Sequence, residues 1–282
     1  MVKVMETNGT YVKAYNNYEF LNSAEARSLR ILAEFHEPKS RFKKYNIVDT
    51  VVFFGSARLL SSKDANEQLA KFKERESDKN SDIYKEELKL AENLVEMSKY
   101  YDEAAELAKR LTEWSKNLPT TDKRFIVCSG GGPGIMEAAN KGAKEADGFS
   151  IGMNISIPFE QYVNKYLDPR YTFEFHYFFM RKFWFVYLAK ALIVFPGGFG
   201  TLDELMEVLT LVQTGKIKKE MKIIVYGEEF WKKIVNFDAL ADMGVISRED
   251  MELFDFCNTV DDAFGKITAH LEEHYLDKEA SL

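Results

Sequence analysis

Residues 191–204 read ALIVFPGGFGTLDE, a run of five apolar residues followed at once by a glycine-rich turn and then by residues suited to a helix. RFIVCSGGGPGIMEAAN, at residues 124–140, follows the same plan. Strands that are apolar throughout are typical of a parallel sheet covered by helices on both faces. Because such runs alternate with helical stretches along the chain, the sequence predicts an α/β fold with a doubly wound, mostly parallel sheet flanked by helices.

The other elements of this fold are predicted from the same apolar periodicity. Strands are expected at 49–55, 124–130, 149–157, 171–176, 191–195, 221–226 and 254–260. Helices are expected at 135–145, 180–190, 202–214, 229–243 and 261–275. Ligands of doubly wound sheets bind beyond the carboxyl ends of the strands, so the loops that follow the strands are the candidate site.

Two helical segments are predicted outside this alternation. An N-terminal extension, residues 1–47, has a helix that is capped by Ser23 and ends before Pro38, since proline disfavours the helical conformation of the residue before it. A charged insert at about 61–118 is predicted to form two helices, around 63–80 and 83–116, with solvated charges. No linker composition interrupts the chain, so residues 1–282 are predicted to form a single domain.

Composition excludes several classes of protein. The 282 residues are 46% hydrophobic and 29% charged, the balance of a globular protein with a sizeable core. A net charge of −7 argues against binding to a nucleic acid polymer. No stretch approaches the roughly 18 apolar residues of a membrane span, and the N-terminus lacks the apolar core of a signal peptide. We therefore expect a cytoplasmic protein without a membrane partner.

Cysteine and histidine usage predicts neither a disulfide framework nor a metal site. The two cysteines, Cys128 and Cys257, suit a reducing compartment. His270 and His274 are four residues apart, but no glutamate base lies between them. We interpret this pair as surface residues rather than metal ligands.

The two glycine-rich loops are suited to binding an anion. Glycines let the backbone approach a ligand closely, and the helix that follows each loop supplies unpaired N–H groups. In the second loop Thr201 is predicted to cap the helix. Glu204 follows Thr201 by three residues, so it is either the second half of a capping box or a catalytic carboxylate.

Common nucleotide and hydrolase signatures are absent from the sequence. The pattern G-x-G-x-x-G would need glycine at position 135 or 203, where Ile135 and Asp203 stand. G-x-x-x-x-G-K-[ST] and G-x-S-x-G are missing as well. Neither a dehydrogenase, nor a P-loop ATPase, nor a nucleophile-elbow hydrolase is indicated.

Three motifs together carry a family resemblance. PGGFGTLDE at 196–204, MRK at 180–182 and SGGGPGIMEAAN at 129–140 resemble the LOG (Lonely Guy) family of cytokinin riboside 5′-monophosphate phosphoribohydrolases, also labelled lysine decarboxylase-like. FFGSAR at 53–58 is similar to the family's first nucleotide-contacting loop, and the likeness spans roughly 48–227. The resemblance implies a Rossmann-like fold, a homodimer or higher homo-oligomer, and hydrolysis of a nucleoside 5′-monophosphate to free base and ribose 5-phosphate. It implies no metal or organic cofactor.

The resemblance also implies roles for individual residues. Arg181 and Glu204 match the family's catalytic arginine and glutamate. The implied contacts to substrate and phosphate are Ser56, Gly131, Gly132, Met136, Lys182, Gly197, Gly198, Gly200 and Thr201. Cleavage of a glycosidic bond develops positive charge on the ribose, which a carboxylate stabilises, and an arginine fork suits phosphate or ribose oxygens.

Several readings of the function stay open. The extension and the insert resemble the longer bacterial branch of the family, so AMP-like nucleotides are as consistent with the sequence as cytokinin ribosides. Two alternatives are a non-catalytic nucleotide-binding protein with the same phosphate-cradling loop, and an enzyme that transfers ribosyl phosphate to an acceptor other than water. Lysine decarboxylation is disfavoured, because it normally needs an electron sink such as pyridoxal phosphate and no residue marks a Schiff-base lysine.

Overall fold

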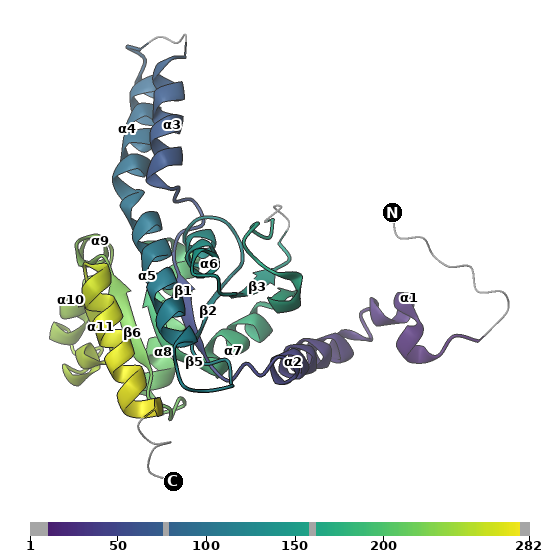
Figure 1. Ribbon diagram of the computed structural model, residues 1–282. Helices are drawn as coiled ribbons and strands as arrows, with labels where there is room; N and C mark the ends of the chain where they lie inside the picture. The colour runs from purple at the N-terminus through teal and green to yellow at the C-terminus, as the bar shows by residue number, and fades with distance from the viewer. Residues whose placement is uncertain (1–10, 76–78, 158–161, 277–282) are drawn as a thin grey trace.

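A seven-stranded sheet forms the centre of the protein, whose computed structural model describes residues 11–75, 79–157 and 162–276 (Figure 1). The strands are β1 (Thr50–Phe54), β2 (Ile126–Ser129), β3 (Ile151–Ile155), β4 (Thr172–Phe175), β5 (Ala189–Val194), β6 (Lys222–Tyr226) and β7 (Asp255–Cys257). Their order is β4-β3-β2-β1-β5-β6-β7, and every neighbouring pair is parallel. The chain winds outward from β1 to β4, then returns to the other side of β1 at β5. This confirms the predicted doubly wound α/β fold.

Eleven α-helices are present in the described parts of the chain. They are α1 (Tyr18–Leu21), α2 (Arg27–Lys44), α3 (Ser62–Lys73), α4 (Asp82–Met97), α5 (Lys99–Lys116), α6 (Ile135–Glu145), α7 (Phe178–Leu188), α8 (Phe199–Gln213), α9 (Glu228–Ile234), α10 (Phe237–Asp242) and α11 (Val260–Leu271). Within these described parts, no helix combines the length and apolar character needed to cross a membrane.

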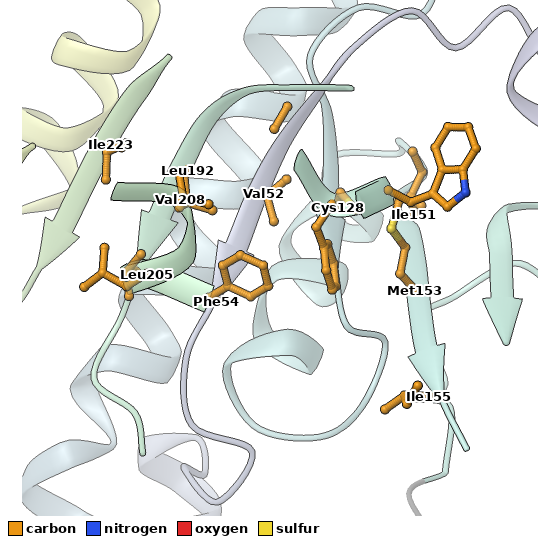
Figure 2. Packing of buried hydrophobic residues seen from close by; sticks show 14 of the residues in the cluster. Val52, Phe54, Cys128, Ile151, Met153, Ile155, Leu192, Leu205, Val208 and Ile223 are labelled. Carbon is orange, nitrogen blue, oxygen red and sulfur yellow. The ribbon is translucent and has the colours of Figure 1, made fainter. Parts of the chain in front are cut away.

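Each face of the sheet has its own hydrophobic core. Successive side chains of a strand point to opposite faces. Accordingly, Val51 and Phe53 of β1 join a cluster with α5, α6 and α11, while Val52 and Phe54 join a second cluster with α2, α7 and α8. Figure 2 shows part of the second cluster, with Phe54 beside Leu205 of α8. The continuous apolar strands are therefore buried on both faces, as the sequence predicts.

The N-terminal helix continues through Pro38, so the predicted end before this proline is wrong. Pro38 lies buried inside α2 and cannot donate to the carbonyl of Glu34, four residues earlier. The indole Nε1 of Trp184 donates to that carbonyl instead, at 2.9 Å. A partner distant in sequence thus replaces the missing helical bond. The predicted cap at Ser23 is also wrong, because α2 begins at Arg27.

The charged insert contains three helices rather than two. In Figure 1, α3 and α4 form a hairpin that projects from the body, and α5 continues from α4 onto the sheet. The break between α4 and α5 is at the buried Ser98, whose hydroxyl donates to the carbonyl of Val95 at 2.6 Å and lies 3.0 Å from the Ser62 hydroxyl. A side chain that bonds to its own backbone competes with the helical pattern, which explains the interruption.

The helix predicted at 229–243 is likewise divided into α9 and α10. Val235 is extended, and the Asn236 side chain caps α10 by accepting from the Ala239 amide at 3.0 Å. An asparagine cap ends one helix and starts another without a glycine or proline signal. The assignment of residues 1–282 to one domain stays a prediction, because residues 1–10 and 277–282 lie outside the described ranges.

Candidate functional site

A cavity of about 750 Å³ opens at the carboxyl ends of the central strands. It lies where the winding reverses between β1 and β5, the switch point at which doubly wound sheets bind ligands. The loops after these strands are joined there: the Ser56 amide donates to the Pro196 carbonyl at 2.9 Å, and the Phe195 amide to the Phe54 carbonyl at 2.8 Å. The cavity is lined by residues of both loops and of neighbouring elements, among them Arg58, Gly130, Met136, Ile155, Phe178, Arg181, Gly197, Gly198, Gly200, Thr201, Asp203 and Glu204.

The second glycine-rich loop leads directly into α8. The helix begins at Phe199 after an extended Gly198, so the predicted cap at Thr201 is wrong: Thr201 is the third residue of the helix. A Cβ at position 197 would collide with the Thr201 side chain, so only glycine lets the turn close this tightly. The first amides of a helix have no partner within the helix. Those of α8 border the cavity and form a cradle for an anion.

Glu204 lies in the second turn of α8 with its carboxylate beside the cavity. This position removes the capping-box alternative, since the glutamate of a capping box is three residues beyond the cap. The residue is only 6% exposed, and its Oε2 atom has no hydrogen-bond partner among the described residues. Burial raises the pKa of Glu204 to about 7, although the positive charges of Lys182 and Arg181 oppose the shift. Such a carboxyl exchanges protons near neutral pH, as a catalytic acid or base must.

Arg181 reaches the same cavity from the first turn of α7. Its Nε donates to the carbonyl of Met153 on β3 at 2.7 Å, and its guanidinium carbon lies 5.0 Å from the centre of the Phe185 ring. A Cβ on Gly130 would collide with its Nη2 atom, so the guanidinium rests directly on the first glycine-rich loop. Burial lowers the pKa of Arg181, while the charge of Glu204 opposes this. The terminal nitrogens, which have no hydrogen-bond partner among the described residues, remain available to ligand oxygens.

Comparison with known proteins connects this geometry to a family. Residues 136–267 match the family described as possible lysine decarboxylase. The cytokinin riboside 5′-monophosphate phosphoribohydrolase LOG of Oryza sativa subsp. japonica is 27% identical over 178 residues, which cover 62% of this chain and 69% of the rice protein. A cytokinin riboside 5′-monophosphate phosphoribohydrolase of Mycobacterium marinum is 37% identical over 75 residues, which cover 27% of this chain and 40% of the mycobacterial protein. This chain resembles the LOG family.

Solved structures resemble this chain only at low similarity. A molybdenum cofactor binding protein from Rippkaea orientalis is 18% identical, with a TM-score of 0.44 over 60% of this chain and 86% of that chain. The molybdenum cofactor carrier protein of Chlamydomonas reinhardtii is 20% identical, with a TM-score of 0.41 over 61% of this chain and 88% of that chain.

Six of the nine contacts implied by the LOG resemblance line the cavity together with Arg181 and Glu204. They are Ser56, Met136, Gly197, Gly198, Gly200 and Thr201. The other three do not line it. The carbonyls of Gly131 and Gly132 accept from the buried Asn164 side chain, and Lys182 forms ion pairs of 2.7 Å with both Asp203 and Glu207. Their contact with substrate stays a prediction.

Several lining residues were missed by the sequence analysis. Ile155 and Phe178 reach the cavity from β3 and α7, and apolar residues in apolar segments carry no signal of such a role. Gly130 and Arg58 stand inside the motifs SGGGPGIMEAAN and FFGSAR. Their signal was available, because Arg58 follows one predicted strand and Gly130 is the last residue of another, and a ligand is expected at the carboxyl ends of the strands.

No metal site is formed by the described residues. Nowhere in them do three or more His, Cys, Asp or Glu side chains come together in a group that could hold a metal ion. The rings of His270 and His274 lie 4.5 Å apart and both residues are only partly exposed, so the interpretation of this pair as surface residues is wrong in part. Burial and the neighbouring His274 lower the pKa of His270.

Proposed function

We propose that the protein hydrolyses the N-glycosidic bond of a nucleoside 5′-monophosphate to a free base and ribose 5-phosphate. The observation that carries the proposal is Glu204, a buried carboxylate with an unpartnered oxygen, one turn beyond the anion cradle at the start of α8. The cradle is thereby available to the 5′-phosphate of the substrate, and the Glu204 carboxylate to the other end of the same ribose. The names of the rice and mycobacterial relatives support the same chemistry.

The reaction follows from these placements. The α8 amides and Ser56 bind the phosphate, which fixes the ribose and aligns C1′. As the glycosidic bond breaks, the ribose gains oxocarbenium character, and the Glu204 carboxylate stabilises that charge. Water adds its hydroxyl to C1′, while its remaining proton passes by way of Glu204 to the nitrogen of the departing base. Arg181 holds phosphate or ribose oxygens with its free terminal nitrogens.

The base belongs at the apolar end of the cavity, beside Met136, Ile155, Ile157 and Phe178. Such walls favour a flat, weakly polar ring. They accommodate the adenine of AMP and also the substituted adenine of a cytokinin riboside monophosphate. We propose both as substrates to test, and we propose that no metal or organic cofactor takes part.

The test is incubation with a panel of ribo- and deoxyribonucleoside 5′-monophosphates, including AMP and a cytokinin riboside monophosphate. Base and ribose 5-phosphate are followed by chromatography. Glu204→Gln is expected to lower kcat by at least about 100-fold, the usual contribution of a general acid or base, with AMP affinity retained in calorimetry. Glu207→Gln is the matched control on the same helix, and its kcat is expected to stay close to that of the native protein.

Two outcomes would contradict the proposal. Full activity in Glu204→Gln would exclude the assigned role of the carboxylate. Saturable AMP binding with no base released from any substrate would favour the alternative of a non-catalytic nucleotide-binding protein, because the cradle alone suffices to bind phosphate.

We further propose that the protein is a homodimer or higher homo-oligomer. The outer side of α7 leaves large aromatic side chains in solvent, notably Phe178, Phe179 and Tyr187, each about half exposed. A further cavity of about 550 Å³ adjoins Phe179 and Tyr187, between α7 and the end of α8. An exposed patch of this kind usually marks an interface, and a second copy of the chain is the proposed partner. A cytoplasmic location is part of the same proposal and is supported by the two free cysteines.

A further inference from the structure

The first glycine-rich loop is held from behind by a buried polar network. Ser129, Asn140, Ser150 and Asn164 are all buried, and they come from β2, α6 and the segments before and after β3. Asn140 accepts from the Ser129 hydroxyl at 2.8 Å and from the Asn164 amide at 2.8 Å, and donates to the Ser150 hydroxyl at 2.9 Å. A buried network whose members are satisfied makes a rigid support.

Asn164 is the member of this network that grips the loop itself. Its side-chain nitrogen donates to the carbonyls of Gly131 at 3.0 Å and Gly132 at 3.1 Å, and its backbone amide donates to Gly131 at 2.9 Å. Both carbonyls are thereby bonded to Asn164, which does not line the cavity. Gly130, the residue just before them, is the one that contacts Arg181.

The position of Arg181 therefore depends on this loop. Its Nε is fixed by the Met153 carbonyl and its flat face by Phe185, and Gly130 lies directly against its Nη2 end. A shift of the loop would carry Gly130 into the guanidinium or away from it. We propose that Asn164 is a positioning residue for Arg181, acting through the carbonyls of Gly131 and Gly132. This inference rests on the proposed function.

Two substitutions test the proposal, one at Asn164 and one at Gly130, where the loop contacts Arg181. Asn164→Asp keeps the shape of the side chain but replaces the donor with an oxygen that faces three acceptor oxygens. Gly130→Ala adds a methyl group at the guanidinium, where the colliding atoms are the movable ends of Arg181 and Met136 rather than backbone. This second variant should fold even if the first does not.

The controls separate positioning from stability. Ser150→Ala removes a bond at the far end of the same network. Gly265→Ala adds a Cβ on α11 with no atom within 4 Å. Gly265→Ala is expected to retain the native kcat whatever its melting temperature, and Ser150→Ala, which leaves the bonds from Asn164 to the loop in place, is expected to lower kcat less than Asn164→Asp does.

For a nucleotide that the native protein hydrolyses, we expect Asn164→Asp and Gly130→Ala to lower kcat by about 10- to 100-fold, as misplacement of a catalytic group by about 1 Å does. KM should change less, because the α8 cradle is untouched. The pH midpoint of kcat/KM should also rise. Glu204 faces the positive charges of Arg181 and Lys182 from α7 and the negative charges of Asp203 and Glu207 from its own helix. Moving Arg181 away removes a charge that lowers the pKa of Glu204, so this pKa should rise.

Each result bears on the proposal. Native kcat and an unmoved pH midpoint in both variants overturn it, even if their melting temperatures fall. If the native protein releases no base from any nucleotide, the proposed function fails, and the affinity for AMP then decides. At least fivefold weaker AMP binding in both variants than in Gly265→Ala supports positioning of Arg181 by the loop, and equal affinity overturns it.

Discussion

Glu204 is held at a cost to stability that its surroundings only partly offset. Its pKa rises from an ordinary value of 4.5 to about 7 on folding, because burial penalises the charged form. Below pH 4.5 the carboxyl is protonated in both the folded and the unfolded chain, so it costs nothing. Between pH 4.5 and 7 only the unfolded chain ionises, so the folded state loses stability as pH rises, by about 3 kcal/mol in total above pH 7.

This linkage predicts that Glu204→Gln is more stable than the native protein in alkaline solution. The gain in free energy of unfolding should be near zero at pH 4.5 and approach about 3 kcal/mol by pH 8. Urea unfolding at a series of pH values measures it, with Glu207→Gln as the control. A constant difference across the series would mean that Glu204 is not buried as an acid.

The same titration predicts the pH dependence of activity. Stabilisation of an oxocarbenium ion needs the carboxylate, so kcat/KM should rise with pH and level off above a midpoint near 7. Substrate phosphate also titrates, near pH 6. Repeating the profile with the residual activity of Glu204→Gln separates the titration of Glu204 from that of the phosphate, because only the titration of the phosphate should remain in this variant. A native profile that falls through pH 7 would assign Glu204 as an acid instead.

At the scale of elements, α2 shows how a tertiary partner overrides a local stop signal. The Trp184 indole replaces the bond that Pro38 cannot make. Trp184→Phe is therefore expected to cost about 1 kcal/mol more in the native background than in Pro38→Ala, where the alanine amide can bond to Glu34 itself. Urea unfolding of the four proteins in this double-mutant cycle measures the difference. Strict additivity would show that the indole bond contributes nothing.

The observed helices differ from the predicted ones where a side-chain hydrogen bond sets the course of the helix. The strands were predictable because burial on both faces makes each a continuous apolar run, as in β5 and β6. The continuation of α2 through Pro38 and the break at Ser98 were not predictable, because a bond from a distant indole decides the first and a bond from a local hydroxyl decides the second. In the site, motifs located Arg181 and Glu204, whereas Phe178 joins them only through folding.

At the scale of the whole molecule, the α3–α4 hairpin is a separable projection (Figure 1). Its buried side chains Phe72 and Tyr84 stack on each other, with ring centres 5.1 Å apart. At its base the Ser62 hydroxyl lies 3.0 Å from the hydroxyl of Ser98, the residue that follows α4, so the two ends of the hairpin are close.

Replacing residues 63–93 with a short glycine-serine linker should therefore leave the sheet and the cavity intact. This deletion keeps Leu94 and Met97, which pack on the core. We expect AMP affinity and base release to stay within about twofold of native values, since none of the described residues in the deleted segment lines the cavity. Loss of cooperative unfolding would show that the hairpin supports the fold, and a lower mass in light scattering would show that it joins copies of the protein.

The exposed aromatic side of α7 is the proposed interface between copies of the protein. Phe179 is 51% and Tyr187 52% exposed, so charging them should leave the fold of a single copy unchanged while placing like charges in the proposed interface. We expect Phe179→Glu with Tyr187→Glu to reduce the mass measured by light scattering to that of a monomer. Leu90→Glu is the matched control, since Leu90 is 62% exposed and belongs to α4 rather than to α7. An unchanged mass in the double variant would place the interface elsewhere. If activity falls together with mass, the cavity depends on the partner copy, because Phe178 lies both in the cavity wall and next to Phe179 on this surface.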